Sequence, residues 1–396
     1  MILILCLALL QESTVQELLR DLGAESIDVR EKAEKTLAAK GNAIEPDLRK
    51  ALETATSEPK GRITALIRLI EGRRSGRILF NKSNAIWACN FDGADAREVF
   101  AAKSCALQGF SWSPDLKAFS FTSNKDGNYD VYCSALDLKA ERLKVDVKRD
   151  YITRTRWSPD GATVAFEVDG HTVGTGGVYV VGRDGTKPRR LTGAEGWDGR
   201  MSWSPKGDRL ALSAQTKLNV TENGRTILVD RKSELELVEV ATGKRTRLTD
   251  LGAHVEEVAW SPDGAWIAFS TEGGVFRIPP EGGDPKSVHK GRCERLSWSP
   301  DGKRLGILTL DRPSVGEPFK GQPAGKDVVA IVPLEGKAVV IEGHGEIDDF
   351  DWSRCGAYLV RVDGKRLVRT DSKGGNEAIL VKELEFSSGV AWGGKR

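Results

Sequence analysis

Histidine and cysteine are scarce in this sequence, which has 4 histidines and 6 cysteines among 396 residues. The cysteines are far apart, no C-x-x-C pair occurs, and neither an H-x-H nor an H-E-x-x-H motif is present. Because the ligand spacings of zinc sites are missing, we expect neither a metal ion nor another cofactor. A Cys89–Cys105 disulfide would suit an exported protein, but we favour single buried thiols.

An excess of either charge is also missing. The chain has 59 Lys and Arg against 57 Asp and Glu, a net charge of +2, and both signs are scattered. Because nucleic-acid-binding domains carry a basic patch or stripe, we expect no nucleic-acid partner. After residue 10 no apolar run approaches the roughly 18 to 20 residues that a membrane-spanning helix needs, so we expect no transmembrane span.

The first residues, MILILCLALLQES, contain a nine-residue apolar run from Ile2 to Leu10. A run of this size is typical of the hydrophobic part of a secretory signal, although no Lys or Arg precedes it and no A-x-A-like site follows. The alternatives are an apolar helix start or a misassigned initiation codon. We interpret residues 1–12 as a signal peptide and expect a periplasmic or otherwise exported protein, with a cytoplasmic location as the alternative.

Residues 13–74 carry helix signals that the rest of the chain lacks, and their apolar residues recur at helical spacing. The signals are two capping-box pairs, two C-cap glycines and a first-turn proline: Ser13 with Gln16, Asp28 with Glu31, Gly41, Gly72 and Pro46. The stretch DVREKAEKTLAAKGNAIEPDLRKAL resembles a HEAT-like helical repeat. Since solenoids need about three repeats, we expect this segment to pack on the domain that follows or on a partner.

From residue 75 onward one phrase recurs, a tryptophan followed by a Ser-Pro-Asp-Gly turn and an apolar strand, as in RLSWSPDGKRLGIL. The spacings between tryptophans range from 38 to 57 residues, close to the 40 to 50 residues of a four-stranded propeller blade. We expect these indoles to be structural and to pack between blades. The seven tryptophans are Trp112, Trp157, Trp203, Trp260, Trp298, Trp352 and Trp392.

The two ends of residues 75–396 complete one phrase. In full units the second strand begins six residues after the tryptophan, whereas the chain stops four residues after Trp392 and Arg77 fits the sixth place. We therefore expect a mainly β fold, a seven-bladed β-propeller closed by N- and C-terminal strands, with the small helical segment before it. Closure leaves no long exposed sheet edge.

The phrase W-S-P-D-G, with the later VY, RDG and RLT elements, resembles the TolB-like propeller repeat, also called the WD-like repeat of bacterial envelope proteins. The resemblance covers about residues 75–396. It implies the fold and leaves the function open, because the repeat serves translocation-complex proteins, peptidase domains and proteins of unknown role. TolB itself is usually six-bladed, which keeps six blades as the alternative.

The loops that join blades differ most between repeats. If the tryptophan strand is the first of each blade, these loops lie on the face opposite the Ser-Pro turns, together with the long insertions at 216–232 and 311–325. Residues six positions before a tryptophan should then ring the central opening and form a binding rim. The candidate binding residues of this rim are Tyr151, Trp197, His254, Arg292, Glu346 and Phe386.

No motif for catalysis is present, and in particular no G-x-S-x-G elbow of a hydrolase. We expect a non-catalytic interaction scaffold of the cell envelope, a monomer that binds a protein or peptide partner over the rim. The first alternative is a small-ligand or glycan binder that uses Trp197, Tyr151 and Phe386 as stacking surfaces. A propeller enzyme, a hydrolase or lyase, is less favoured, because it would have to draw its acid and base from residues such as His254 and Glu346.

Overall fold

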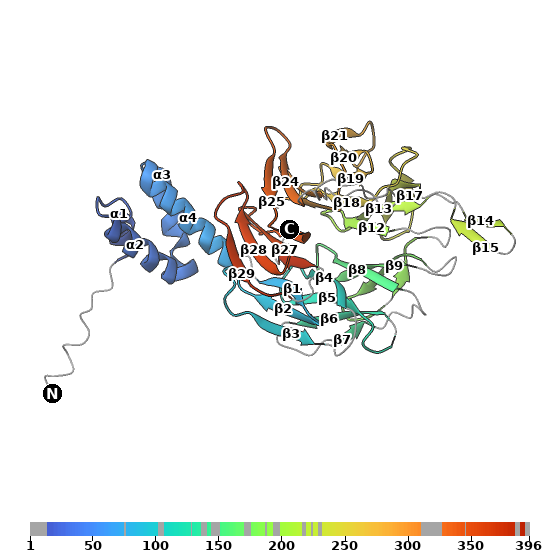
Figure 1. Ribbon diagram of the computed structural model, residues 1–396, viewed down its shortest axis with the longest axis horizontal. Coiled ribbons are helices and arrows are strands. Elements are labelled where there is room, and N and C mark those ends of the chain that lie inside the picture. Colours follow the sequence, from blue (N-terminus) through green and yellow to red (C-terminus); the bar gives the residue numbers. More distant parts are fainter. Residues whose placement is uncertain are drawn as a thin grey trace, which may run out of the picture. The chain divides into compact units, whose positions relative to one another are not determined.

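A computed structural model describes the protein (Figure 1). It describes residues 14–74, 77–101, 107–127, 129–135, 141–143, 151–169, 176–186, 188–192, 199–215, 219–222, 225–228, 232–309, 327–344, 346–384 and 389–392. The chain divides into two compact units, Met1–Ser75 and Gly76–Arg396. No helix in these ranges is long and apolar enough to cross a membrane.

The first unit is helical. Its elements are α1 (Val15–Asp21), α2 (Ile27–Lys40), the 3-10 turn η1 (Gly41–Ile44), α3 (Glu45–Thr54) and α4 (Ser57–Arg74). Apolar residues at helical spacing pack into one core, which includes Leu22, Leu37, Leu48 and Ile70. Each of these four side chains is fully buried, so the helical periodicity of the sequence reports the core directly.

The helix boundaries differ in part from those that the sequence predicts. The capping box of α1 uses Thr14 and Glu17, one residue later than predicted, and Asp28 lies inside the first turn of α2, after the N-cap Ser26. Gly41 does end α2, with a left-handed φ of 64°. Gly72 does not end a helix, because α4 continues past it. The HEAT-like character of the unit stays a prediction.

The second unit contains seven four-stranded antiparallel sheets, which confirms the predicted mainly β, seven-bladed propeller and excludes the six-bladed alternative. The first three blades, from inner to outer strand, are β30 (Val390–Trp392), β1 (Ile78–Lys82), β2 (Ala85–Cys89), β3 (Arg97–Ala101); β4 (Leu107–Trp112), β5 (Ala118–Ser123), β6 (Asp130–Ala135), β7 (Glu141–Leu143); and β8 (Tyr151–Trp157), β9 (Thr163–Asp169), β10 (Gly177–Gly182), β11 (Arg189–Arg190).

The other four blades follow the same order. They are β12 (Gly199–Trp203), β13 (Arg209–Gln215), β16 (Ser233–Glu239), β17 (Arg245–Arg247); β18 (Glu257–Trp260), β19 (Ile267–Thr271), β20 (Gly274–Ile278), β21 (Lys286–His289); β22 (Arg295–Trp298), β23 (Arg304–Thr309), β24 (Val328–Pro333), β25 (Val339–Glu342); and β26 (Ile347–Trp352), β27 (Tyr358–Asp363), β28 (Arg366–Asp371), β29 (Ala378–Val381). A separate hairpin, β14 (Asn219–Glu222) and β15 (Arg225–Leu228), lies in the predicted insertion at 216–232. The insertion at 311–325 lies outside the described residues.

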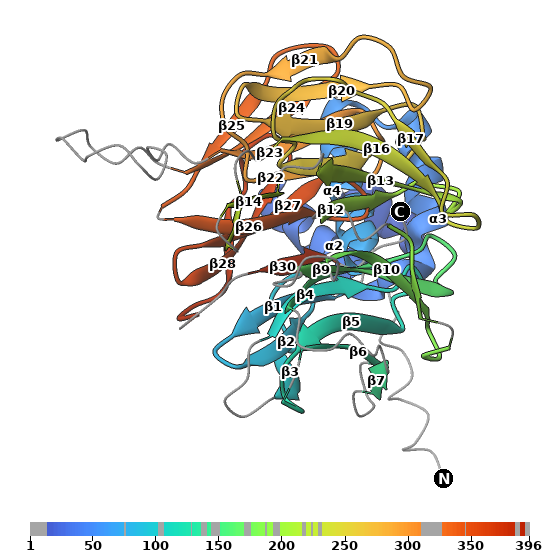
Figure 2. The same ribbon diagram turned by 90° about the vertical axis from the view of Figure 1, so that its right-hand side faces the viewer.

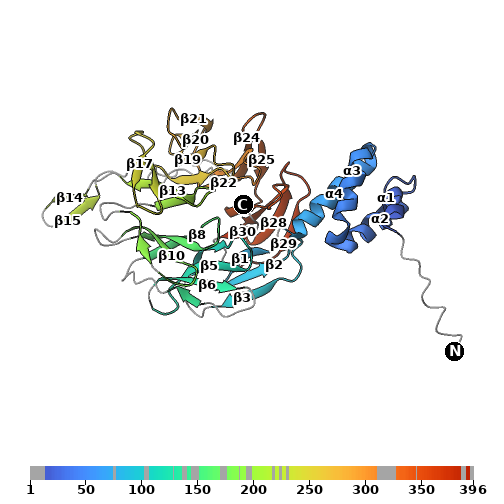
Figure 3. The same cartoon turned by 180° about the vertical axis from the view of Figure 1, so that it is seen from behind.

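The blades follow one another around a common centre in chain order (Figure 2). β30 pairs with β1 through Ile78 with Trp392, Leu79 with Ala391 and Phe80 with Val390, and the two strands lie side by side in Figure 3. The first blade therefore combines strands from the two ends of the propeller unit, and no sheet of the ring lacks its inner strand.

Each Ser-Pro turn is held by its own side chains. In the turn after Trp112, the Ser113 hydroxyl donates to Asp115 over 2.6 Å, and Asp115 accepts the amide of Lys117 over 3.0 Å. The amide of Ala118, the first residue of β5, donates back to Ser113 Oγ. Three further turns repeat this arrangement, at Ser158, Ser261 and Ser299. The recurring S-P-D phrase is thus a self-contained connection between the first and second strands of a blade.

Candidate functional site

The inner strands of the blades surround a cavity of about 380 Å³. Its lining begins two or three residues before each tryptophan and in four blades continues to the Ser-Pro turn, so it occupies the half of the central channel beside those turns. Four turn prolines line this end: Pro114, Pro159, Pro205 and Pro262. The cavity therefore lies toward the face of the Ser-Pro turns, opposite the loops that join the blades.

Residue types alternate along each inner strand, and this alternation determines which side chains line the cavity. The residues at the tryptophan position and two before it are aromatic or aliphatic in most blades, whereas the positions one and three before are small or charged. The charged residues three positions before a tryptophan form what we name the charged belt: Arg154, Arg200, Glu257, Arg295 and Asp349. In the two remaining blades this position is glycine, Gly109 and Gly389.

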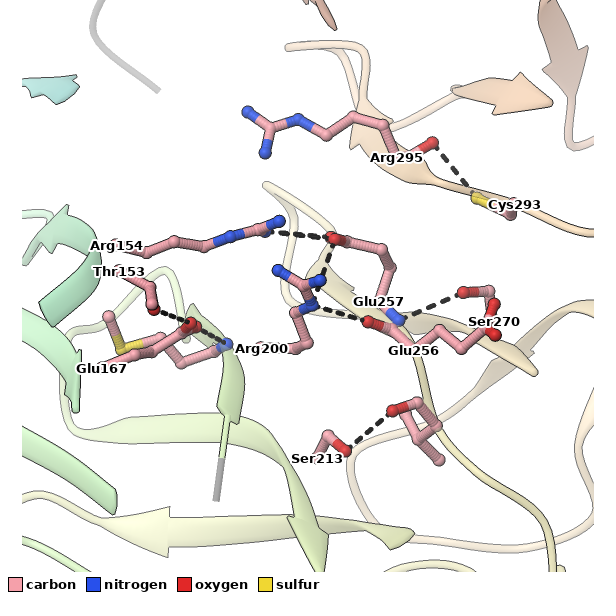
Figure 4. A network of polar contacts seen from close by, with 12 residues as sticks. Thr153, Arg154, Glu167, Arg200, Ser213, Glu256, Glu257, Ser270, Cys293 and Arg295 are labelled. Carbon is pink, nitrogen blue, oxygen red and sulfur yellow. Dashed lines mark hydrogen bonds and ion pairs between the residues drawn. The ribbon is translucent and has the colours of Figure 1, made fainter. Parts of the chain in front are cut away.

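Two arginines of the charged belt converge on Glu257. Arg154 Nη1 lies 3.1 Å and Arg200 Nε 3.5 Å from Glu257 Oε1 (Figure 4). Burial alone would raise the pKa of Glu257, but the charges of Arg154, Arg200 and Arg295 outweigh it and hold that pKa below its usual value. Glu257 is therefore a carboxylate that keeps two guanidinium groups together.

The third arginine is held by the other acid of the charged belt. Arg295 Nε lies 2.8 Å from Asp349 Oδ1, and Asp349 also accepts the backbone amides of Phe350 and Val390. The guanidinium of Arg295 extends toward the same space as the Arg154–Glu257 pair (Figure 4). Two acids on the inner strands β18 and β26, on either side of β22, thus orient three arginines.

The backbone at Arg200 is strained. Its φ is 49°, a left-handed value that costs a non-glycine residue of the order of 1 kcal/mol. The pairing of β12 with β13 shifts register between Gly199 and Met201, so Arg200 is the extra residue of a β-bulge. Bulges re-aim side chains and are common beside functional sites. Here the bulge directs Arg200 to Glu257 and to the backbone carbonyl of Glu256, 3.0 Å from Nε.

Within the charged belt the arginine side chains are more exposed than the acidic side chains. The side chains of Arg154, Arg200 and Arg295 are 20%, 42% and 25% exposed, whereas those of Glu257 and Asp349 are 7% and 9% exposed. A ligand in the cavity therefore meets N–H donors that carry positive charge. This arrangement suits an anionic group of planar geometry, such as a carboxylate.

The tryptophans form a second ring beside the charged belt. Five indole N–H groups donate to the carbonyl of the residue that precedes the tryptophan of the previous blade: Trp112 to Ala391 (3.3 Å), Trp157 to Ser111 (3.1 Å), Trp203 to Arg156 (3.1 Å), Trp298 to Ala259 (3.0 Å) and Trp352 to Ser297 (3.1 Å). At the other two junctions a side chain bonds the tryptophan backbone amide instead, Ser202 for Trp260 and Asp351 for Trp392. Each tryptophan therefore belongs to a blade junction, and all except Trp352 also contribute to the cavity lining.

The predicted binding rim does not coincide with this cavity. His254 Nδ1 lies 2.8 Å from Ser233 Oγ, Arg292 pairs with Glu294 over 3.2 Å, and Glu346 is exposed. None of these three lines the cavity, because they precede the inner strands at the opposite end. Tyr151 begins β8, and its side chain, like Trp197 and Phe386, lies outside the described residues. A binding role for the six residues stays a prediction.

Sequence reasoning missed the charged belt, although a signal was present. Segments such as TRTRW, GRMSW and CERLSW place a charged residue three positions before a tryptophan, on a strand that otherwise alternates toward the core. Among the described residues, no three His, Cys, Asp or Glu are grouped as metal ligands would be.

Comparison with known proteins finds distant relatives over part of the chain. No protein-family model matches the chain. The uncharacterized peptidase YuxL of Bacillus subtilis is 27% identical over 141 residues, 30% of this chain and 21% of the relative. The Protein TolB homolog of Chlorobium luteolum is 28% identical over 157 residues, 37% of this chain and 34% of the relative. The chain thus spans about a third or less of the length of these relatives.

A solved structure shares the fold. The crystal structure described as oligogalacturonate lyase in complex with manganese superposes with a TM-score of 0.55 at 15% identity, over 78% of this chain and 86% of that chain. Similarity at this level concerns the architecture of the propeller. The functions of these proteins are those of a peptidase, a TolB homolog and a lyase, so the fold alone does not select among them.

Proposed function

We propose that this protein is a non-catalytic interaction module of the cell envelope that binds a peptide segment of a protein partner in the central cavity. The observation that carries the proposal is the charged belt, whose exposed arginines are oriented by buried acids in a cavity of about 380 Å³. Propeller scaffolds need no such charges for packing, and charges are costly to bury without a purpose. The similarity to a TolB homolog supports an envelope role, and the apolar run at Ile2–Leu10 supports export.

A catalytic role is less well supported. The cavity lining contains arginines, acids and serines, but none of the described histidines, His254, His289 and His344, belongs to it. Hydrolysis or elimination needs a nucleophile or base beside an acid. Glu257 is held as a carboxylate by arginines, which makes it a poor proton acceptor. The names of the peptidase and lyase relatives therefore do not lead us to propose a reaction.

The experiment compares the two candidate surfaces in the full chain. Capture of envelope proteins, read by mass spectrometry, is carried out with the wild type, with Arg154→Gln/Arg200→Gln in the cavity, and with His254→Ala/Arg292→Ala on the predicted rim. We expect a partner that the cavity variant loses and the rim variant keeps. Loss only in the rim variant would move binding to the opposite face, and turnover of a hydrolase or lyase substrate panel that the cavity variant abolishes would replace binding by catalysis.

A further inference from the structure

The charged belt carries information about the chemistry of the ligand. Its three arginines have different degrees of exposure, but all three side chains are partly exposed and line the cavity, while Glu257 and Asp349 are nearly covered. Arg156 lines the same cavity one position before Trp157. The charged side chains of the lining are therefore mainly cationic, four arginines against Glu257 and Asp351, although the whole chain is nearly neutral.

The three arginines of the charged belt all interact with the same carboxylate, that of Glu257. Arg154 and Arg200 both contact Glu257, and Arg295 is near enough for its charge to lower the pKa of Glu257 as well. Figure 4 shows the guanidinium of Arg295 directed to the space beside this cluster. One small anion at this point would receive donors from three blades. Glu257 satisfies only part of these donors, since its carboxylate is shared between two arginines.

Between the charged belt and the turn prolines the cavity wall alternates between apolar and polar residues. The polar ones lie one position before a tryptophan and are Ser111, Arg156, Ser202, Ser297 and Asp351. The residues two positions before the tryptophans include Phe110, Met201, Val258, Leu296 and Phe350, all of which contribute to the lining. A ligand that fills the cavity would therefore carry apolar carbon atoms next to its anionic group. A peptide with an acidic residue beside apolar residues has this composition, whereas a uronate oligosaccharide carries hydroxyl groups around its whole length.

We infer that Arg154, Arg200 and Arg295 bind a carboxylate of an acidic peptide segment, and that the cavity thereby selects partners with an Asp, Glu or C-terminal carboxylate next to apolar residues. The inference rests on the proposed peptide-binding function and adds its specificity. Glu257 and Asp349 are positioning residues, because they hold the arginines and are nearly covered from the ligand. Charge-assisted bidentate bonds of this kind are specific for carboxylate geometry.

The test selects phage-displayed random heptapeptides on the immobilised full chain. We expect the selected peptides to be enriched in Asp and Glu beside apolar residues. A synthetic peptide of the selected sequence should lose at least about tenfold in affinity when its acids are replaced by the corresponding amides, measured by fluorescence polarisation. Arg154→Gln and Arg200→Gln should lower the affinity for the acidic peptide by a similar factor and leave the affinity for the amide peptide unchanged.

A matched control variant separates a general effect of losing positive charge from a specific effect of the cavity arginines. Arg277 stacks on Trp266 on an outer part of its blade, 4.4 Å from guanidinium carbon to ring centroid, and does not line the cavity. Arg277→Gln removes the same charge and should leave the affinity unchanged. An equal loss with Arg277→Gln would overturn the assignment to the charged belt.

Arg200→Gly distinguishes binding from folding. Glycine accepts the left-handed φ of 49°, and this relief offsets the loss of the Arg200–Glu257 contact, so the variant should unfold within about 2 °C of the wild type while losing the acidic peptide. A larger fall in the unfolding temperature would show that Arg200 serves the fold instead. Selection of neutral peptides would overturn the inferred specificity for carboxylates but would agree with the proposed peptide binding. Selection of no peptide would contradict the proposed function, and binding of trigalacturonate by the same arginines would replace the peptide by a carboxylated saccharide.

Discussion

At the residue scale, Leu116 stands where the other Ser-Pro turns have glycine. The equivalent residues Gly161, Gly264 and Gly302 have φ values of 71°, 78° and 68°, and Leu116 adopts a φ of 58°. Glycine reaches this region without the steric cost that a Cβ atom imposes. The turn geometry is therefore fixed by the S-P-D hydrogen bonds, and leucine is forced to follow it.

We predict that Leu116→Gly raises the free energy of unfolding by about 0.5 to 1 kcal/mol, because relief of the left-handed strain exceeds the extra entropy of glycine in the unfolded chain. Urea denaturation measures the change. The reverse exchange Gly302→Leu is the control and should destabilise by about 1 to 2 kcal/mol. A loss of stability in Leu116→Gly would show that contacts of the partly buried Leu116 side chain outweigh the strain.

Asp115, in the same turn, links stability to pH. Burial opposes its ionisation, but hydrogen bonds from Ser113 and Lys117 and the neighbouring Arg183 outweigh burial and lower its pKa to about 2. Since the unfolded value is about 3.9, the stabilisation is complete above about pH 4 and is lost as the pH falls toward 2. The pKa values of Asp160 and Asp301 are lowered in their turns as well.

We predict that Asp115→Asn is less stable than the wild type at pH 7 and that this difference shrinks steadily below pH 4. Urea denaturation at a series of pH values between 7 and 3 measures it. The direction follows from the lowered pKa, because only the ionised carboxylate of the wild type gains from the turn. A difference that stays constant over the series would mean that Asp115 acts through packing or neutral hydrogen bonds.

At the element scale, the indole bonds between blades provide a matched pair of tryptophans. Trp298 Nε1 donates to the Ala259 carbonyl over 3.0 Å, whereas Trp392 Nε1 has no hydrogen-bond partner among the described residues. Both side chains are buried to a similar degree, 6% and 5% exposed. The two indoles therefore differ in this hydrogen bond. Trp392 also contacts the ring of Phe91, and its backbone amide bonds Asp351, a contact that an exchange of the side chain leaves in place.

We predict that Trp298→Phe costs about 1 to 2 kcal/mol more in unfolding free energy than Trp392→Phe, because it also leaves the Ala259 carbonyl unpaired. Chemical denaturation of the two variants gives the difference. Both exchanges remove similar aromatic volume, so each serves as the control of the other. Equal losses would indicate that the indoles stabilise the ring by packing alone.

The sequence repeat allowed the blades to be predicted, but it did not reveal the charged belt. Tryptophan, Ser-Pro and glycine recur at fixed positions because most blades join their first and second strands by the same turn, so their spacing reports the architecture. The belt position varies, with Arg154, Glu257 and Asp349 in different blades, and its meaning depends on which strands meet around the ring. Sequence reasoning chose the variable loop residues such as His254, because loops carry function in many propellers. The strained φ of Arg200 has no sequence signal.

At the scale of the whole molecule, closure couples the fold to the cavity. β30 completes the first blade, and its residues also complete the inner wall, since the amides of Val390 and Trp392 donate to Asp349 and Asp351 of the preceding blade. Asp349 in turn orients Arg295. A change at one end of the propeller unit therefore reaches the charged belt through a single strand.

We predict that removal of residues 389–396 lowers the unfolding temperature by at least about 10 °C, because it opens the ring, exposes the edge of β1 and removes amide partners of buried acids. Replacement of 219–228 by a short Gly-Ser link is the control, since the β14–β15 hairpin belongs to no blade, and should shift the temperature by less than about 2 °C. Scanning calorimetry with size-exclusion chromatography measures both variants. An unchanged unfolding temperature in the truncated chain would show that β1 needs no strand at its inner edge, and that contacts between the remaining strands hold the seven blades together.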